Sequence, residues 1–254
     1  MKKINFLLSS VILCLCCSCM KVTMEQQIDN IFTFVEQDSD LQGLFDKAPT
    51  VSENEIIEYY SYILTDKLKI KDIWTQDFTV EDTVSGPKEC QNLVAEIPGK
   101  NKKNQSIIIS APLNDPVACI SAIEIMKTMK KAKVRKSNAI RLLLFDGDEG
   151  CHTYRDISRT RNEAILFNVE LEKMDKTFQN FSIFERNDIF ESVRDIVPQY
   201  LNSYAPCSIL YDESDISHAI NPHYQFVTSE SSATSFNSLK TNISLSASLI
   251  CILN

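Results

Sequence analysis

Three acidic residues that follow a short apolar run are the strongest chemical signal in this sequence. Asp146, Asp148 and Glu149 come directly after Ile140–Phe145, and a run this short between polar residues predicts a buried strand. Open α/β sheets bind their ligands beyond the carboxyl ends of the strands. Carboxylates placed there can hold a divalent cation or accept a proton during hydrolysis. We therefore expect these residues to form the core of any active site.

The elements around this run alternate between strands and helices, which is typical of a three-layer α/β/α domain with a central mixed sheet. A Ser-Glu-Asn-Glu sequence from Ser52 predicts a capping box. The turn at Pro98-Gly99 predicts that the strands on either side of it are neighbours. The expected helices are Met24–Gln37, Ser52–Leu68, Pro116–Lys131 and Asp188–Leu201, and the expected strands are Trp74–Val80, Asn92–Ile97, Ser106–Ala111, Ile140–Phe145, Ala164–Leu171, Phe181–Phe184 and Ser208–Tyr211.

The first residues predict a targeting segment. Lys2 and Lys3 precede an apolar stretch, Ile4–Leu15, that is too short to span a bilayer, and Ser18-Cys19 follows. This pattern is typical of a bacterial lipoprotein signal in which Cys19 becomes the lipidated first residue; the alternative is an ordinary secretory signal. Both predict export, and the first predicts a membrane-anchored protein of the cell envelope. Residues 1–19 are then the signal, and residues 20–254 form a single domain.

Composition narrows the possible partners. The formal net charge of −8 argues against nucleic acid, whose phosphates require a basic patch. The lysine-rich tract Lys127–Lys136 is interpreted as a solvated helix end and loop. Five cysteines outside the signal are too scattered for a disulfide framework or a zinc knuckle, so we expect buried small side chains: Cys90, Cys119, Cys151, Cys207 and Cys251.

Several motifs in a fixed order resemble a known family. Asn92–Gly99, Ile107–Ala111, a helix that carries Glu124, and Ile140–Gly150 together look like the co-catalytic zinc exopeptidases, which include secreted bacterial aminopeptidases and glutaminyl cyclases. The resemblance covers residues 91–174 well and the flanks poorly, above all the Ser-rich residues 229–254. It implies a zinc-aminopeptidase-like (phosphorylase/hydrolase-like) fold, two zinc ions, and a peptide or protein N-terminus as substrate.

The resemblance also implies roles for individual residues. Asp148 falls on the general-base position, and Glu149 on a zinc-ligand position. Asp115 falls on the ligand that bridges the two ions, although an aspartate before a helix is also a common N-cap. Glu170 falls where the family has an aspartate ligand. His218 lies two positions after the place of the family's last histidine.

The sequence departs from the family at both histidine positions. Pro112 stands at the first, and Ile216 at the second. Zinc prefers nitrogen and sulfur donors, so the remaining carboxylates suit calcium or magnesium better, or hold no metal.

Three functions follow as hypotheses. The first is a metal-dependent exopeptidase, and the second is a catalytically inactive relative that binds a peptide or protein at the cell surface. The third is a haloacid-dehalogenase-like phosphatase, because Asp146-Gly-Asp148 after an apolar strand resembles that family's nucleophile loop and Asp212–Asp215 resembles a magnesium motif.

Overall fold

The computed structural model describes residues 22–52, 55–82, 86–101, 105–132, 134–171, 180–184, 187–205, 207–212, 220–221, 225–228 and 236–254. The helices are α2 (Met24–Glu36), α3 (Leu41–Lys47), α4 (Ile56–Tyr62), α5 (Pro116–Lys131), α6 (Gly147–Thr160), α7 (Asn187–Leu201) and α8 (Phe236–Leu253), with a 3-10 turn η1 (Ala48–Thr50) and a π-helix η3 (Ile63–Lys67). The strands are β1 (Asp72–Asp82), β2 (Gly86–Ile97), β3 (Gln105–Pro112), β4 (Ala139–Phe145), β5 (Ala164–Glu170), β6 (Asn180–Phe184), β7 (Ser208–Asp212) and β8 (Gln225–Thr228).

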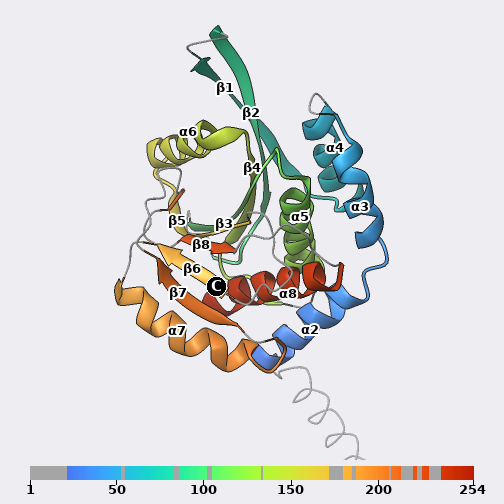
Figure 1. The fold of residues 1–254 in the computed structure, drawn as a ribbon. Helices are drawn as coiled ribbons and strands as arrows, with labels where there is room; N and C mark the ends of the chain where they lie inside the picture. The colour runs from blue at the N-terminus through green and yellow to red at the C-terminus, as the bar shows by residue number, and fades with distance from the viewer. Residues whose placement is uncertain are drawn as a thin grey trace, which may run out of the picture.

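The strands form one mixed sheet in the order β1-β2-β4-β3-β5-β8-β6-β7. The central strands β4, β3, β5 and β8 run parallel to one another. β2 is antiparallel to both β1 and β4, and its first half continues with β1 as a ribbon beyond the sheet (Figure 1). Helices cover both faces of this sheet, which confirms the predicted three-layer α/β/α fold.

Alternate side chains of the central strands face opposite layers. Ile107 and Ile109 on β3 pack into the larger core, to which α2, α5 and α8 contribute. Ile108, between them, packs on the other face with Cys151 and Tyr154 of α6. This alternation, with both faces buried, explains why β3 and β4 read as continuous apolar runs.

The prediction that Asn92–Ile97 and Ser106–Ala111 are neighbouring strands is wrong, because β4 lies between them. Ile140 on β4 pairs with Ile97 on β2 at one side and with Ile107 on β3 at the other. The connection from β3 through α5 returns the chain as a parallel strand beside β3. That strand, β4, is almost wholly apolar, so it is best placed where a ladder on each side satisfies its backbone.

The predicted helix Ser52–Leu68 starts later than expected and is not uniform. It begins at Ile56, becomes π-helical at Ile63, and its N-cap residue Glu55 makes no side-chain capping bond. The Ser52 hydroxyl instead donates to the Glu55 carboxylate at 2.8 Å. The two side chains expected to cap backbone groups therefore bind each other.

The C-terminal segment differs most from the sequence analysis. Residues expected to match the fold poorly form α8, whose serines Ser244, Ser246 and Ser248 are buried. α8 packs against α2 and α5 (Figure 1). Among the described helices, none is long and apolar enough to cross a membrane. The five cysteines outside the signal are all buried, as expected.

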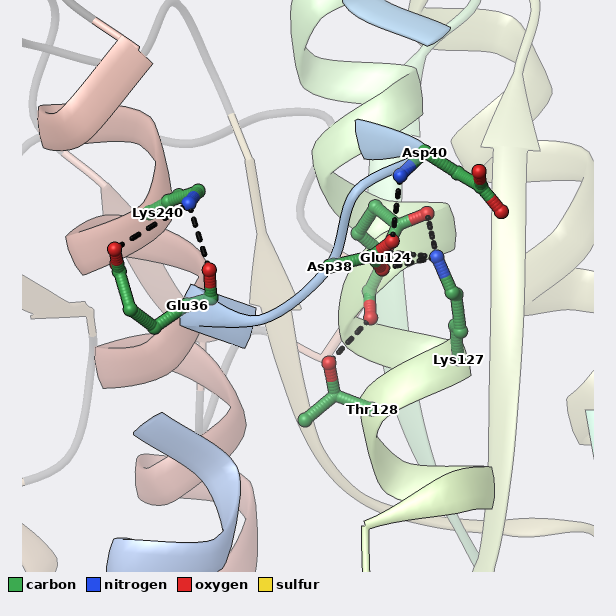
Figure 2. A network of polar contacts seen from close by, with 7 residues as sticks. All are labelled: Glu36, Asp38, Asp40, Glu124, Lys127, Thr128 and Lys240. Carbon is green, nitrogen blue, oxygen red and sulfur yellow. Dashed lines mark hydrogen bonds and ion pairs between the residues drawn. The ribbon is translucent and has the colours of Figure 1, made fainter. Parts of the chain in front are cut away.

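The sequence analysis interpreted Lys127 as part of a solvated tract, and this is wrong. Lys127 instead joins a buried ionic cluster. Figure 2 shows its ammonium between Asp38, in the turn after α2, and Glu124, one helical turn earlier on α5. Thr128 donates to the Glu124 carbonyl at 2.7 Å. Although burial alone raises the pKa of Asp38, the ammonium of Lys127 holds it below its ordinary value. Burial raises the pKa of Glu124 to about 8.

This cluster predicts a pH-dependent stability. The native Glu124 keeps its proton up to about pH 8, whereas the unfolded carboxyl loses it near 4.5. The native state thus binds more protons in this window, and stability falls as pH rises through it. Glu124→Gln removes this pH-dependent loss of stability. The free energy of unfolding of the variant therefore exceeds that of the wild type by an amount that grows between pH 5 and 8. Urea denaturation at several pH values measures the difference.

The matched control is Glu36→Gln, which neutralises an exposed carboxylate near Lys240 on the surface (Figure 2). Its difference from the wild type stays flat across the same range, because exposed ion pairs contribute little. A flat difference for Glu124→Gln contradicts a buried carboxyl with a raised pKa.

Candidate functional site at the carboxyl ends of β3, β4 and β5

The sheet topology brings the predicted site residues to one edge. Pro112 at the end of β3 pairs with Phe145 at the end of β4. Ser110 on β3 pairs with Glu170, the last residue of β5. Because these three strands are parallel and adjacent, the segments that carry Asp115, Asp148 and Glu170 leave the same edge of the sheet.

Asp148 and Glu149 lie in the first turn of α6, a helix that the sequence analysis did not predict. Both side chains are exposed. The turn into the helix is sharp, with Gly147 at a φ of 65° that favours glycine. Acidic residues in a first helical turn interact favourably with the helix dipole, so this placement also stabilises α6.

Asp146 fastens this turn to β2. Its carboxylate accepts a hydrogen bond from the Gln91 backbone N–H at 3.3 Å, and its own N–H donates to the Asn92 side-chain oxygen at 3.0 Å. The neighbouring thiol of Cys90 is buried, and burial together with the Asp146 charge raises its pKa. A thiol that resists ionisation is a poor nucleophile, which argues against a catalytic role for Cys90.

Asn92 is the residue that positions the start of α6. It is fully buried on β2, and its amide donates to the Gly150 carbonyl at 2.8 Å and to the Gln76 side chain of β1 at 2.9 Å. Its oxygen accepts from Asp146, as described above. One amide thus joins two strands and a helix, with both its donors and its acceptor used.

Asp115 is the N-cap of α5. One of its carboxylate oxygens accepts from the backbone N–H of Val117 at 3.1 Å and of Ala118 at 3.0 Å. Pro116 occupies the first helical position, where its missing N–H costs nothing. Of the two alternatives for Asp115, the cap is therefore the one whose contacts are present.

Glu170 lies in a polar network beneath the sheet edge and is fully buried. Its Oε2 accepts from the Gln225 amide of β8 at 2.6 Å and from the Asn168 amide at 3.4 Å. Asn168 in turn accepts from the Ser110 hydroxyl at 3.0 Å. The carboxylate therefore joins β8 to β5 and β3 inside the molecule.

Solved structures of the same architecture cover most of the chain. LapB from Legionella pneumophila aligns over 92% of this chain and 76% of its own, with a TM-score of 0.63 at 12% identity. A Zn-dependent exopeptidase from Parabacteroides distasonis covers 88% and 97%, with 0.54 at 11%. The glutaminyl cyclase of Bacteroides thetaiotaomicron covers 89% and 97%, with 0.55 at 10%. This chain has the zinc-exopeptidase fold. No protein-family model and no curated protein matches its sequence.

The described part of this zinc-exopeptidase-like chain does not fit a two-zinc centre. Within it, no three His, Cys, Asp or Glu side chains are placed to hold a metal ion. Pro112 offers no side-chain donor, Asp115 caps a helix, and Glu170 is bonded to two amides. His218 and Cys19 lie outside the described residues, so their predicted roles stay predictions.

Sequence reasoning missed the polar residues that connect the site to the rest of the sheet. Asn92 had a detectable signal, because it is a polar residue directly before the apolar run Leu93–Ala95. Asn168 also interrupts an apolar strand. Gln225 had no such signal, since β8 was not predicted and its partner, Glu170, is distant in sequence.

Packing of Gly150 against Asn92 yields a testable prediction. A Cβ at Gly150 lies 2.4 Å from the Asn92 oxygen, so Gly150→Ala displaces the amide that holds α6. We expect the free energy of unfolding to fall by about 1–3 kcal/mol. Gly43→Ala is the control, because nothing lies within 4 Å of a Cβ there. In α3 it raises stability by about 0.5–1 kcal/mol. Equal effects in urea denaturation contradict this packing.

Proposed function

We propose that this chain is a zinc-exopeptidase-like protein that binds peptides without hydrolysing them. The observation that carries the proposal is the burial and hydrogen bonding of Glu170. Its carboxylate falls on a metal-ligand position by resemblance, yet it is fully buried and accepts amide hydrogen bonds from Gln225 and Asn168. These bonds hold the carboxylate in the protein interior, and no histidine stands at Pro112 to share a zinc ion with it.

The exposed carboxylates at the same edge support binding of a cationic group. Asp148 and Glu149 project from the first turn of α6, free of the structural bonds that hold Asp115 and Glu170. The charged amine of a peptide N-terminus is the cation that this fold's aminopeptidase relatives act on. The proposed ligand is thus a peptide or protein whose free N-terminus contacts these two carboxylates.

An active metal-dependent exopeptidase is the second candidate. It is favoured by the adjacent ends of β3, β4 and β5, which carry the family's carboxylate positions to one edge. In that case Asp115, Glu149, Glu170 and His218 hold metal, and Asp148 is the base.

One set of measurements separates the two. We expect purified protein to contain far less than one zinc per chain and to release no chromophore from aminoacyl substrates, with or without added zinc. Zinc near two equivalents, with turnover abolished by Asp148→Asn, establishes the enzyme and overturns the proposal.

Binding is tested with a labelled peptide whose N-terminus is free or acetylated. The free form binds more tightly, and a double variant, Asp148→Asn with Glu149→Gln, removes the preference. A double variant of equal charge on α2, Glu25→Gln with Glu36→Gln, keeps it. Equal affinities for the two peptides contradict recognition of the N-terminus.

We further propose that the chain is anchored by a lipid on Cys19, in keeping with the Ser18-Cys19 signal. Cys19→Ala then moves the protein from the membrane fraction to the soluble fraction and abolishes labelling with a fatty acid. Cys16→Ala, in the same segment, keeps both. Membrane retention of Cys19→Ala would show that this cysteine is not the anchor.

A further inference from the structure

Two adjoining pockets lie between the N-terminal helices and α5, apart from the strand-end residues. One has a volume of about 320 Å³ and is bounded by α3, α4 and η3. The other has a volume of about 300 Å³ and is bounded by α3, η3 and α5. They share Asp40, Leu44, Ile63 and Lys67, so they form one groove, named here the lysine groove. Its size suits a small molecule.

The lysine groove is cationic in a protein that is acidic overall. Its lining includes four lysines, Lys47, Lys67, Lys127 and Lys131, against two acidic residues, Asp40 and Glu124. Burial raises the pKa of Glu124 to about 8, so this carboxyl is mostly protonated at neutral pH and repels an anion little. The chain as a whole carries −8.

Two of these lysines are available to a ligand. Lys67 and Lys131 are exposed, and neither forms an ion pair within the part of the chain that the structure describes. Lys127 differs, because Asp38 and Glu124 hold its ammonium in the groove wall (Figure 2).

Apolar side chains and one buried hydroxyl also line the groove. Leu44 and Ile63 are buried side chains that line both pockets. Tyr59 lines the first pocket beneath Lys47, whose Nζ lies 5.2 Å from the ring centroid. The Tyr59 hydroxyl is buried and has no hydrogen-bond partner among the described residues. A buried hydroxyl without a partner is costly and calls for an acceptor.

The backbone at the groove is also unusual. Ile63–Lys67 is a π-helix, in which the Leu68 N–H donates to the Ile63 carbonyl at 2.9 Å. Its first and last residues, Ile63 and Lys67, are the ones that line both pockets. Single π-turns are rare and occur frequently at functional sites, where they redirect a side chain.

From these observations we propose that the lysine groove binds a small molecule with one carboxylate on an apolar body. The carboxylate contacts the ammonium groups of Lys67 and Lys131, and the apolar body packs against Leu44 and Ile63. This site is separate from the strand-end site, and its occupancy does not depend on peptide binding there.

The test uses the purified full chain, labelled with ¹⁵N, and two probes that differ only in charge: N-acetyl-L-phenylalanine and N-acetyl-L-phenylalanine amide. We expect saturable amide shifts for the acid, concentrated in α3, η3 and the second half of α5, and at least tenfold weaker binding of the amide. Lys67→Gln or Lys131→Gln weakens binding of the acid about tenfold, as expected for loss of a hydrogen bond to a charged group.

Lys88→Gln is the control, because it removes the same charge from an exposed position on β2, outside the groove. Its affinity for the acid equals that of the wild type. The proposal is overturned if acid and amide bind equally, if no saturable shift occurs, or if Lys88→Gln weakens binding as much as Lys67→Gln. The last result indicates general attraction to a charged surface.

Discussion

Burial of both faces of β3 and β4 is the constraint on which the rest of this structure depends. Ile107 and Ile109 face one helical layer while Ile108 faces the other, so a polar side chain within these strands needs a buried partner, as Ser110 has in Asn168 and Arg141 in Glu96. Polar groups that interact with solvent or ligand are therefore confined to the strand ends. For this reason the acidic candidate residues lie at the ends of β4 and β5, and their position there does not depend on a catalytic role.

At those ends, the same side chains have competing structural uses. Asp115 closes the first turn of α5, and Asp146 fastens the turn between β4 and α6 to β2. Asn92 completes that attachment with three hydrogen bonds from one amide group. The Asp115 oxygen that accepts two backbone N–H bonds has no lone pair left for a metal ion, so only the other oxygen of that carboxylate is available to one. The fold can thus keep the family's carboxylate positions while the chemistry there changes.

Glu170 shows the same competition inside the molecule. A carboxyl group away from water is costly unless hydrogen bonds satisfy it, and Gln225 and Asn168 supply two. These bonds join β8 to the centre of the sheet. The likeness to these solved structures at 10–12% identity is a likeness of fold, which depends on layered burial more than on any set of ligands.

The buried cluster around Lys127 and the lysine groove beside it lie outside the strand-end site. α3, α4 and the π-helix lie against α5 here, so the N-terminal helices share the main core with the sheet layers (Figure 1). Lys127 links the turn after α2 to α5 through Asp38. The N-terminal helices are therefore an integral part of the domain.

The sequence by itself determined the elements whose signals are local. Pro116 at a helix start, the periodicity of Met24–Glu36 and the apolar run of β4 each identify an element from its own residues. Only the tertiary structure decided the strand order and α8, a serine-rich helix buried because it packs on α2 and α5. It also decided the bonding of Asp115 and Glu170, since a carboxylate's role depends on partners. The partners of Glu170 include Gln225, which is distant in sequence and lies beside Glu170 only because β8 joins the sheet.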